Sequence, residues 1–373
     1  MRMTKLGTVI IATNEQLTAP FPYFGGKRKV AQEVWRRFGD PKNYVEPFAG
    51  SLAVLLARPS PPKIETVNDL DGMIANFWRA VQAAPDDVAS HADWPVNEND
   101  MEARHYWLVT EGRARLAACL GDPGGYDALV AGWWVWGICA WIGGGWCAGD
   151  GPWWWSGTEW GKLGPKRNRT EAGVSCRLPH LGDAGQGINR QRPHLGDAGR
   201  GINRQRPHLG DGGRGINRQL PHLGSAGRRE YIRGIMNDLS ARLRDVRVCS
   251  GNWSRVCGPS VTDKNGLTCV FLDPPYNNDL RDSVYTEDNG DCAADVRRWA
   301  IENGKNPLLR IALCGYAGEH AMPDDWAVFG WKTQGGLGNQ GNKRGRSNKN
   351  LERIWFSPHC LKPADHDDSG LLS

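Results

Sequence analysis

The chain has 373 residues, of which 40% are hydrophobic and 23% are charged. This composition is typical of a globular protein with two to three domains of about 150 residues each, and it excludes a collagen, a coiled coil and a wholly disordered chain. The net charge of +5 is uneven, because residues 160–229 contain 14 Lys or Arg and only 4 Asp or Glu. Such a basic stretch indicates either a polyanionic partner or a solvated loop. The ten cysteines form no Cys-x-x-Cys pair, so we expect reduced thiols and a cytoplasmic protein.

The first part of the chain predicts alternating helices and strands. The apolar run within residues 1–16 is too short for a signal peptide. The segment AQEVWRRFG has apolar side chains at helical spacing, starting from Val30. Two strand–helix units follow, NYVEPFAG with SLAVLLARP and KIETVNDL with DGMIANFWRAVQ. This alternation is typical of a parallel sheet covered by helices.

The alternation stops at about Pro85, and a tryptophan-rich segment follows. Nine of the 18 tryptophans lie between residues 133 and 160. The uncharged stretch between Asp127 and Asp150 is long enough to cross a bilayer, but it contains six glycines. We therefore predict a helix to about Ile142, followed by a glycine loop, and no membrane span.

The tryptophans of this segment have two possible roles. For Trp133 to Trp141 we favour packing in the protein core. For Trp153, Trp154 and Trp155 we favour stacking on DNA bases, since aromatic rings serve this purpose in nucleic-acid-binding proteins.

A 14-residue repeat starts at residue 179, and related units start at 193, 207 and 221. Each unit has only Leu and Ile as large apolar residues, which is too little to fold alone. Arginines such as Arg200, Arg204 and Arg206 recur in it, so we expect an arm that contacts DNA phosphates; a neutral loop expansion is the alternative. The recurring histidines are better explained by duplication than by a metal array.

Strand and helix patterns resume after the repeats. REYIRGIMNDLSARLRD predicts a helix, and VRVCSGNW, LTCVFLDPPY, LLRIALCG, WAVFGWK and LERIWFSP predict strands. A basic loop before the last strand holds Arg344 and Arg346, which we assign to DNA binding. We infer that residues 1–86 and 228–373 form two halves of one catalytic domain. Residues 87–227 form an inserted DNA-recognition region, with the repeats at 179–229.

Two short motifs mark a ligand site. Parallel sheets bind ligands at the carboxyl ends of their strands, where Gly50 allows a tight turn and Asp69 offers a carboxylate to a ribose. The stronger motif is Asp273-Pro274-Pro275-Tyr276, directly after an apolar strand. Its prolines remove two amide donors, so that carbonyl and carboxylate acceptors lie beside an aromatic ring. An amino group on an aromatic base fits this arrangement.

In chain order, the motifs FPYFGGK, YVEPFAGSLAVLL, VNDLD, CSGNW and FLDPPY resemble those of the Dam-type adenine-specific DNA methyltransferases. The resemblance covers about residues 20–85 and 230–358. It implies a Rossmann-like sheet of seven strands with the last antiparallel, which binds S-adenosylmethionine (AdoMet), and an inserted target-recognition region. A stand-alone modifier from a phage or prophage is the implied context, with or without a restriction partner.

The resemblance also assigns residues to the cofactor. Those at the methionine end, around the pocket and at the ribose are, in chain order, Phe24, Gly25, Gly26, Lys27, Glu46, Phe48, Gly50 and Asp69. The chain departs from the family at two positions. Leu52 replaces a second glycine, and Asn252 replaces an acid, although its amide oxygen is still an acceptor for the cofactor's adenine amino group.

The chemistry implied is N6 methylation of adenine in double-stranded DNA. Asp273 and the Pro274 carbonyl would accept the two hydrogens of the amine and free its lone pair, while Tyr276 stacks on the flipped-out base. No metal is needed. The alternatives are methylation of cytosine or of RNA adenine, and a nucleic-acid-binding protein that has kept this scaffold without activity.

Overall fold

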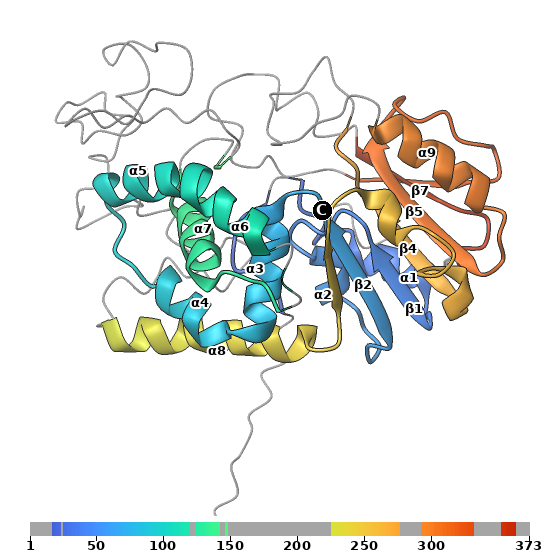
Figure 1. The fold of residues 1–373 in the computed structure, drawn as a ribbon. Coiled ribbons are helices and arrows are strands. Elements are labelled where there is room, and N and C mark those ends of the chain that lie inside the picture. The colour runs from blue at the N-terminus through green and yellow to red at the C-terminus, as the bar shows by residue number, and fades with distance from the viewer. Residues whose placement is uncertain are drawn as a thin grey trace, which may run out of the picture.

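The protein is described from a computed structural model, which covers residues 17–23, 25–119, 122, 124–141, 146–147, 225–276, 292–331 and 352–362. Its centre is a sheet with the strand order β3-β2-β1-β4-β5-β7-β6 (Figure 1). The strands are β1 (Asn43–Glu46), β2 (Ile64–Asp69), β3 (Arg247–Ser250), β4 (Thr268–Leu272), β5 (Leu309–Tyr316), β6 (Ala327–Gly330) and β7 (Glu352–Phe356).

The sheet is parallel from β3 to β5 and antiparallel beyond. Asn43 of β1 lies opposite both Ile64 of β2 and Thr268 of β4, so the first strand is at the middle of the parallel part. β7 runs antiparallel to β5 on one side and to β6 on the other. The last strand of the chain is thus inserted between two earlier ones, which confirms the predicted Rossmann-like methyltransferase sheet.

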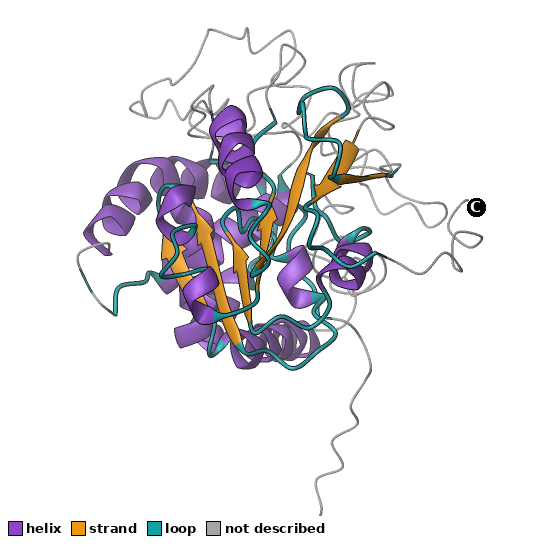
Figure 2. Ribbon diagram, turned by 90° about the vertical axis from the view of Figure 1, so that its right-hand side faces the viewer, coloured by secondary structure: helices purple, strands orange, loops and turns teal. Residues whose placement is uncertain are grey.

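Helices cover both faces of this sheet (Figure 2). They are α1 (Ala31–Phe38), α2 (Ala53–Leu56), α3 (Gly72–Ala83), α4 (Pro85–Ala92), α5 (Glu98–Trp107), α6 (Arg113–Cys119), α7 (Ala128–Ala140), α8 (Ser225–Leu243) and α9 (Cys292–Asn303), with a π-helical turn, η1 (Leu108–Gly112), before α6. Successive strand residues point to opposite faces, so Tyr44 packs in the larger core and Val45 in the second core, which includes Val296 and Ala300 of α9.

Beside the β3 edge, the helices α4 to α8 form a separate layer (Figure 1). Helix α4 packs against α7 and α8, and α3 joins this layer to the sheet through contacts with α7, α8 and β3. Asp71 caps α3 by accepting a hydrogen bond from Met73 N (2.8 Å), and Asp127 caps α7 by accepting one from Val130 N (2.9 Å). Helices α4 and α8, the first and last of this layer in the sequence, also pack against each other, and β3 follows α8 in the chain.

The tryptophans of α7 and its continuation lie in the core. Trp134, Trp136, Trp141 and Trp146 are all buried. A Cβ at Gly137 would overlap the Trp146 ring, so this glycine allows the ring to pack directly on the helix. The core interpretation of the first part of the segment is confirmed. In the described part of the chain, no helix is both long and apolar enough to cross a membrane.

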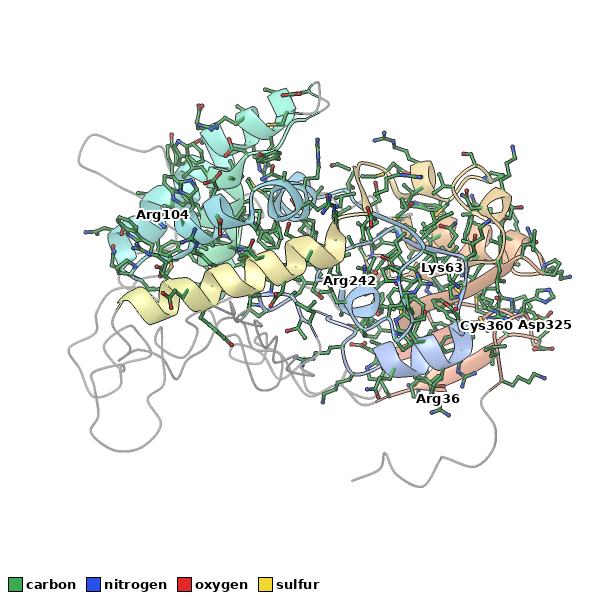
Figure 3. The ribbon with its side chains drawn as sticks, turned by 90° about the horizontal axis from the view of Figure 1, so that it is seen from below. Arg36, Lys63, Arg104, Arg242, Asp325 and Cys360 are labelled. Carbon is green, nitrogen blue, oxygen red and sulfur yellow. The ribbon has the colours of Figure 1, made fainter. Side chains whose placement is uncertain are left out.

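A buried guanidinium lies among these rings. The Cζ atom of Arg104 is 4.4 Å from the ring centre of Trp136, 4.8 Å from that of Trp94 and 4.9 Å from that of Trp133. Figure 3 shows Arg104 within the helical layer. Burial lowers the pKa of Arg104. The flat rings give this cation attractive contacts where water is largely excluded.

We expect Trp136→Ala to destabilise the fold by about 3–5 kcal/mol, because it empties a fully enclosed site. The substitution also removes the hydrogen bond from Trp136 Nε1 to Trp94 O (2.9 Å). Urea unfolding followed by circular dichroism measures the change. Trp94→Ala is the matched control, because its side chain is 46% exposed; equal losses in the two variants would contradict the packing described here.

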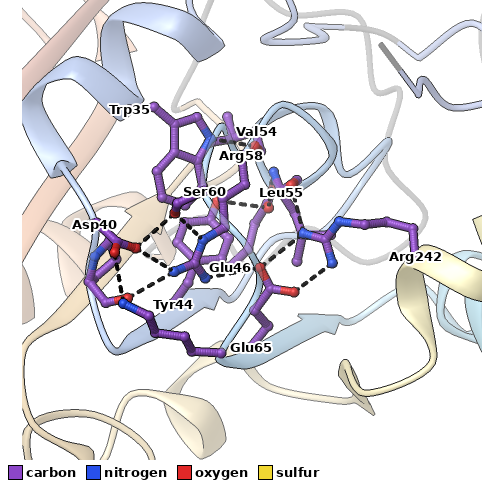
Figure 4. Close-up of polar contacts among 12 residues, drawn as sticks. Trp35, Asp40, Tyr44, Glu46, Val54, Leu55, Arg58, Ser60, Glu65 and Arg242 are labelled. Carbon is purple, nitrogen blue, oxygen red and sulfur yellow. Dashed lines mark hydrogen bonds and ion pairs between the residues drawn. The ribbon is translucent and has the colours of Figure 1, made fainter. Parts of the chain in front are cut away.

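A buried ionic cluster joins parts of the chain that lie far apart in the sequence (Figure 4). Glu65 of β2 accepts from Arg58 Nη1 at 3.1 Å and from both Nη atoms of Arg242 in α8 at 2.7 and 2.9 Å. The Arg58 and Glu65 side chains are 0% and 1% exposed. Arg242 also donates to Leu55 O (3.1 Å). Arg242, which follows residues 87–227 in the chain, is thus bonded to β2, which precedes them.

Candidate active site at the carboxyl edge of the sheet

The residues singled out in the sequence gather where the parallel strands end. Phe48 and Gly50 follow β1, Asp69 ends β2, and Asp273 follows β4. Since neighbouring parallel strands end at the same edge, the fold brings these segments together although they lie far apart in the sequence. This edge divides into a part near Asp69 and a part near Asp273.

Gly50 and Asp69 hold each other in a fixed turn. Gly50 N donates to Asp69 Oδ2 (2.9 Å), and Asp71 N donates to Asp69 Oδ1 (2.9 Å). Gly50 has a φ of +45°, and a Cβ there would lie 2.6 Å from Cε1 of Tyr23. Burial raises the pKa of Asp69 to about 7, against the lowering effect of the Gly50 amide. The role of Asp69 as an acceptor for a ribose hydroxyl stays a prediction; a carboxylate has acceptor sites for more than these two amides.

Leu52 explains how the turn survives without its second glycine. Its φ is +52°, in the left-handed region that glycine adopts readily. Its side chain is completely buried in the larger core and precedes α2 directly. A leucine therefore adopts a left-handed turn here, and its side chain is used for packing.

Glu46 lies beneath this edge. Its Oε2 accepts from Tyr44 Oη (2.9 Å) and Leu55 N (3.3 Å), and the residue is 3% exposed. Burial raises the pKa of Glu46 to about 8, and the hydrogen bond from Tyr44 only partly offsets this. Through these two hydrogen bonds Glu46 links β1 to α2 within the core.

We expect Glu46→Gln to remove a pH dependence of stability. Because the folded state raises the pKa from 4.5 to about 8, the contribution of Glu46 to wild-type stability is largest below pH 4.5 and falls as the pH rises to about 8. Glutamine keeps an acceptor oxygen and does not ionise, so the variant gains on wild type across this range, by on the order of a few kcal/mol. Urea unfolding at pH 5 and pH 8 measures the difference; a difference that does not change with pH would show that Glu46 ionises normally.

Asn252 and an aromatic pair lie at the end of β3. Asn252 Oδ1 accepts from Ser254 N (3.0 Å) and Ser254 Oγ (2.7 Å), which caps the short helical turn Trp253–Val256. Trp253 stacks on Phe48 with ring centres 6.4 Å apart and planes 28° apart. The flat aromatic surface near Asp69 thus has two contributors, of which only Phe48 was predicted.

Lys27 joins the glycine motif to the Asp-Pro-Pro-Tyr motif. Its Nζ is 2.9 Å from Asp273 Oδ2, 2.7 Å from Gly25 O and 3.9 Å from Glu352 Oε2. The Lys27 side chain is 4% exposed and that of Asp273 is 23% exposed. Burial, the largest single effect, would lower the pKa of Lys27, but the combined effects of Asp273, Cys314 and Glu352 outweigh it and the pKa is raised. Lys27 is therefore a buried ammonium held by carboxylates.

Tyr276 completes this group. Its Oη donates to Asp273 Oδ1 (3.0 Å), and its ring meets that of Tyr316 edge to face, with centres 4.7 Å apart. Lys27 Nζ lies 5.2 Å from the centre of the Tyr276 ring. Pro274 is buried and Pro275 half-buried, so the two prolines fix the turn that presents Asp273.

Glu352 and Tyr316 were missed in the sequence. They lie opposite each other in the β5–β7 pair, at the edge that holds Asp273. Burial raises the pKa of Glu352, against the lowering effect of Lys27. An acid at the start of an otherwise apolar strand was the available signal, but nothing local links it to Lys27.

Several predicted site residues lie outside the described residues. These are Phe24, Trp153, Trp154, Trp155, Arg200, Arg204, Arg206, Arg344 and Arg346. Their roles remain predictions from the sequence.

The comparison with protein families agrees with the site. The family model described as D12 class N6 adenine-specific DNA methyltransferase matches residues 23–113, which include the glycine motif, the first two strands and Asp69. No curated protein matches the chain at the threshold applied. Over residues 23–113 the chain is thus similar to the D12 class N6 adenine-specific DNA methyltransferase family, and the order of strands in its sheet is consistent with a Rossmann-like methyltransferase fold.

Proposed function

We propose that the protein is an AdoMet-dependent DNA (adenine-N6)-methyltransferase that acts on a base flipped out of the double helix. The observation that carries this proposal is the placement of Asp273 and Tyr276 beside Lys27 at the sheet edge that also holds Asp69. The family match supports the substrate class, and the chemistry of these side chains supports the reaction.

The residues near Asp69 suit the cofactor. There is no space for a side chain at position 50, where the residue is glycine, and Asp69 offers a carboxylate to a ribose hydroxyl. Phe48 offers an aromatic surface, and Asn252 adds an amide near it. Gly25, Gly26 and Lys27 would hold the amino-acid end, with the Lys27 ammonium facing a carboxylate. When bound, AdoMet supplies a methyl group on a sulfonium.

The residues near Asp273 suit the target amine. Its lone pair is delocalised into the adenine ring, which makes the nitrogen a poor nucleophile. Asp273 would accept one hydrogen and the Pro274 carbonyl the other, which localises the lone pair on nitrogen. Pro275 keeps the turn rigid, and the Tyr276 ring would stack on the base. Asp273 would also be an acceptor for the proton that the nitrogen loses on methylation.

DNA contacts are proposed from the sequence alone. The residues are Trp153, Trp154, Trp155, Arg200, Arg204, Arg206, Arg344 and Arg346, which combine aromatic rings with positive charge. This combination suits binding to phosphates and unstacked bases without identifying a recognition sequence.

Transfer of radiolabelled methyl groups from AdoMet tests the proposal. The purified protein is incubated separately with double-stranded DNA and with RNA, and the products are digested to nucleosides. We expect label in DNA as N6-methyladenine. Label only in RNA, only in cytosine, or in neither polymer would overturn the proposed function.

A further inference from the structure

Each oxygen of the Asp273 carboxylate, the acceptor that methyl transfer requires, already bonds one of the protein's own groups, and one of these groups is a cation. Asp273 Oδ2 faces Lys27 Nζ at 2.9 Å, and Asp273 Oδ1 accepts from Tyr276 Oη at 3.0 Å. An ammonium bonded to a carboxylate withdraws charge from the oxygen and weakens it as an acceptor for a third group. In this arrangement Asp273 is poorly prepared to receive a neutral amine.

Lys27 has an alternative to this ion pair. A second carboxylate, Glu352, lies 3.9 Å from Nζ on the side of β7, beyond hydrogen-bond distance but within reach of a small rotation of the lysine. The Gly25 carbonyl holds another proton of the ammonium at 2.7 Å. Lys27 can therefore leave Asp273 without becoming an unpaired buried charge, which would be costly.

We propose that Lys27 is a positioning residue that blocks Asp273 until the carboxylate of the cofactor draws the ammonium away. The inference rests on the proposed function, because the anion that competes for Lys27 is the amino-acid carboxylate of AdoMet. Asp273 then becomes available to the target amine only when cofactor is bound. Glu352 keeps the displaced ammonium beside the site.

Binding of S-adenosylhomocysteine tests this without turnover. This probe has the same amino-acid end as AdoMet, but its sulfur is uncharged. The charge removed by a substitution at residue 273 therefore has no sulfonium to attract, and the measured affinity reports on the amino-acid end. Asp273→Asn preserves the shape of the side chain and removes the ion pair that the probe must break. We expect calorimetry to show about three- to tenfold tighter binding to this variant than to wild type.

Glu352→Gln is the matched control. It removes the same unit of charge from the surroundings of Lys27, but at 3.9 Å and without a direct hydrogen bond. We expect no tightening of probe binding in this variant, because the Lys27–Asp273 pair that the probe must break is intact. Equal tightening in both variants would mean that loss of negative charge alone explains the effect, and would overturn the proposal.

A Lys27→Met background provides the second test. There the probe binds more weakly, and Asp273→Asn should bring no further gain, because no ammonium remains to be released. Tighter binding from Asp273→Asn in this background, or weaker binding in the single variant, would overturn the inference. If all folded variants bind the probe equally, only the role of Lys27 fails. If wild type does not bind it at all, the proposed function fails with it.

Discussion

Asp273→Ala abolishes methyl transfer, and cofactor affinity stays within about tenfold of wild type, if the two parts of the site divide the work as the geometry indicates. Asp273 follows β4, whereas the residues proposed for the ribose and the pocket follow β1 and β2. Radiolabelled methyl transfer and calorimetry measure the two effects separately. Residual activity above a few per cent of wild type would contradict the assignment of Asp273 as the acceptor.

Asp295→Ala is a suitable control for this variant. Asp295 is on α9, its side chain is 48% exposed, and its ion pair with Arg298 lies within the same helix. Its removal should leave activity unchanged. Asp273→Asn is expected to retain partial activity, because the amide oxygen still accepts one hydrogen bond.

Glu65→Ala is expected to lower the stability of the fold strongly. It leaves the guanidinium groups of Arg58 and Arg242 buried without their shared carboxylate, and removing one partner from a buried ion pair costs about 3–5 kcal/mol. Urea unfolding measures the loss. Lys63→Ala is the control, since Lys63 and its partner Asp40 are 44% and 54% exposed and such pairs add little. A loss in Glu65→Ala as small as that of the control would contradict the role of this cluster.

Local sequence patterns were sufficient for the strands and for the main motifs. β4 is a buried strand that Asp273 follows directly, and β5 is largely apolar apart from Arg310 and ends at Tyr316. The Asp-Pro-Pro-Tyr turn was recognisable because proline restricts the backbone whatever surrounds it. The number of strands and the antiparallel direction of the last one followed from the family resemblance rather than from any of these patterns.

Contacts between residues far apart in the sequence were not predictable from local patterns. Arg242 bonds to Glu65, and Lys27 to Asp273, across a large part of the chain. Such pairs depend on which strands become neighbours, and the residues around each partner carry no sign of it. The same holds for Glu352, whose importance arises from its position beside Lys27 rather than from its own motif.

The most direct test of the account is to map methylated adenines in DNA from cells that express the wild-type protein or the Asp273→Ala variant. The host must lack adenine methylation of its own. The account predicts N6-methyladenine in the DNA of cells with the wild-type protein and none above background with the variant. Absence of N6-methyladenine with a folded wild-type protein, or equal levels with both proteins, would contradict it.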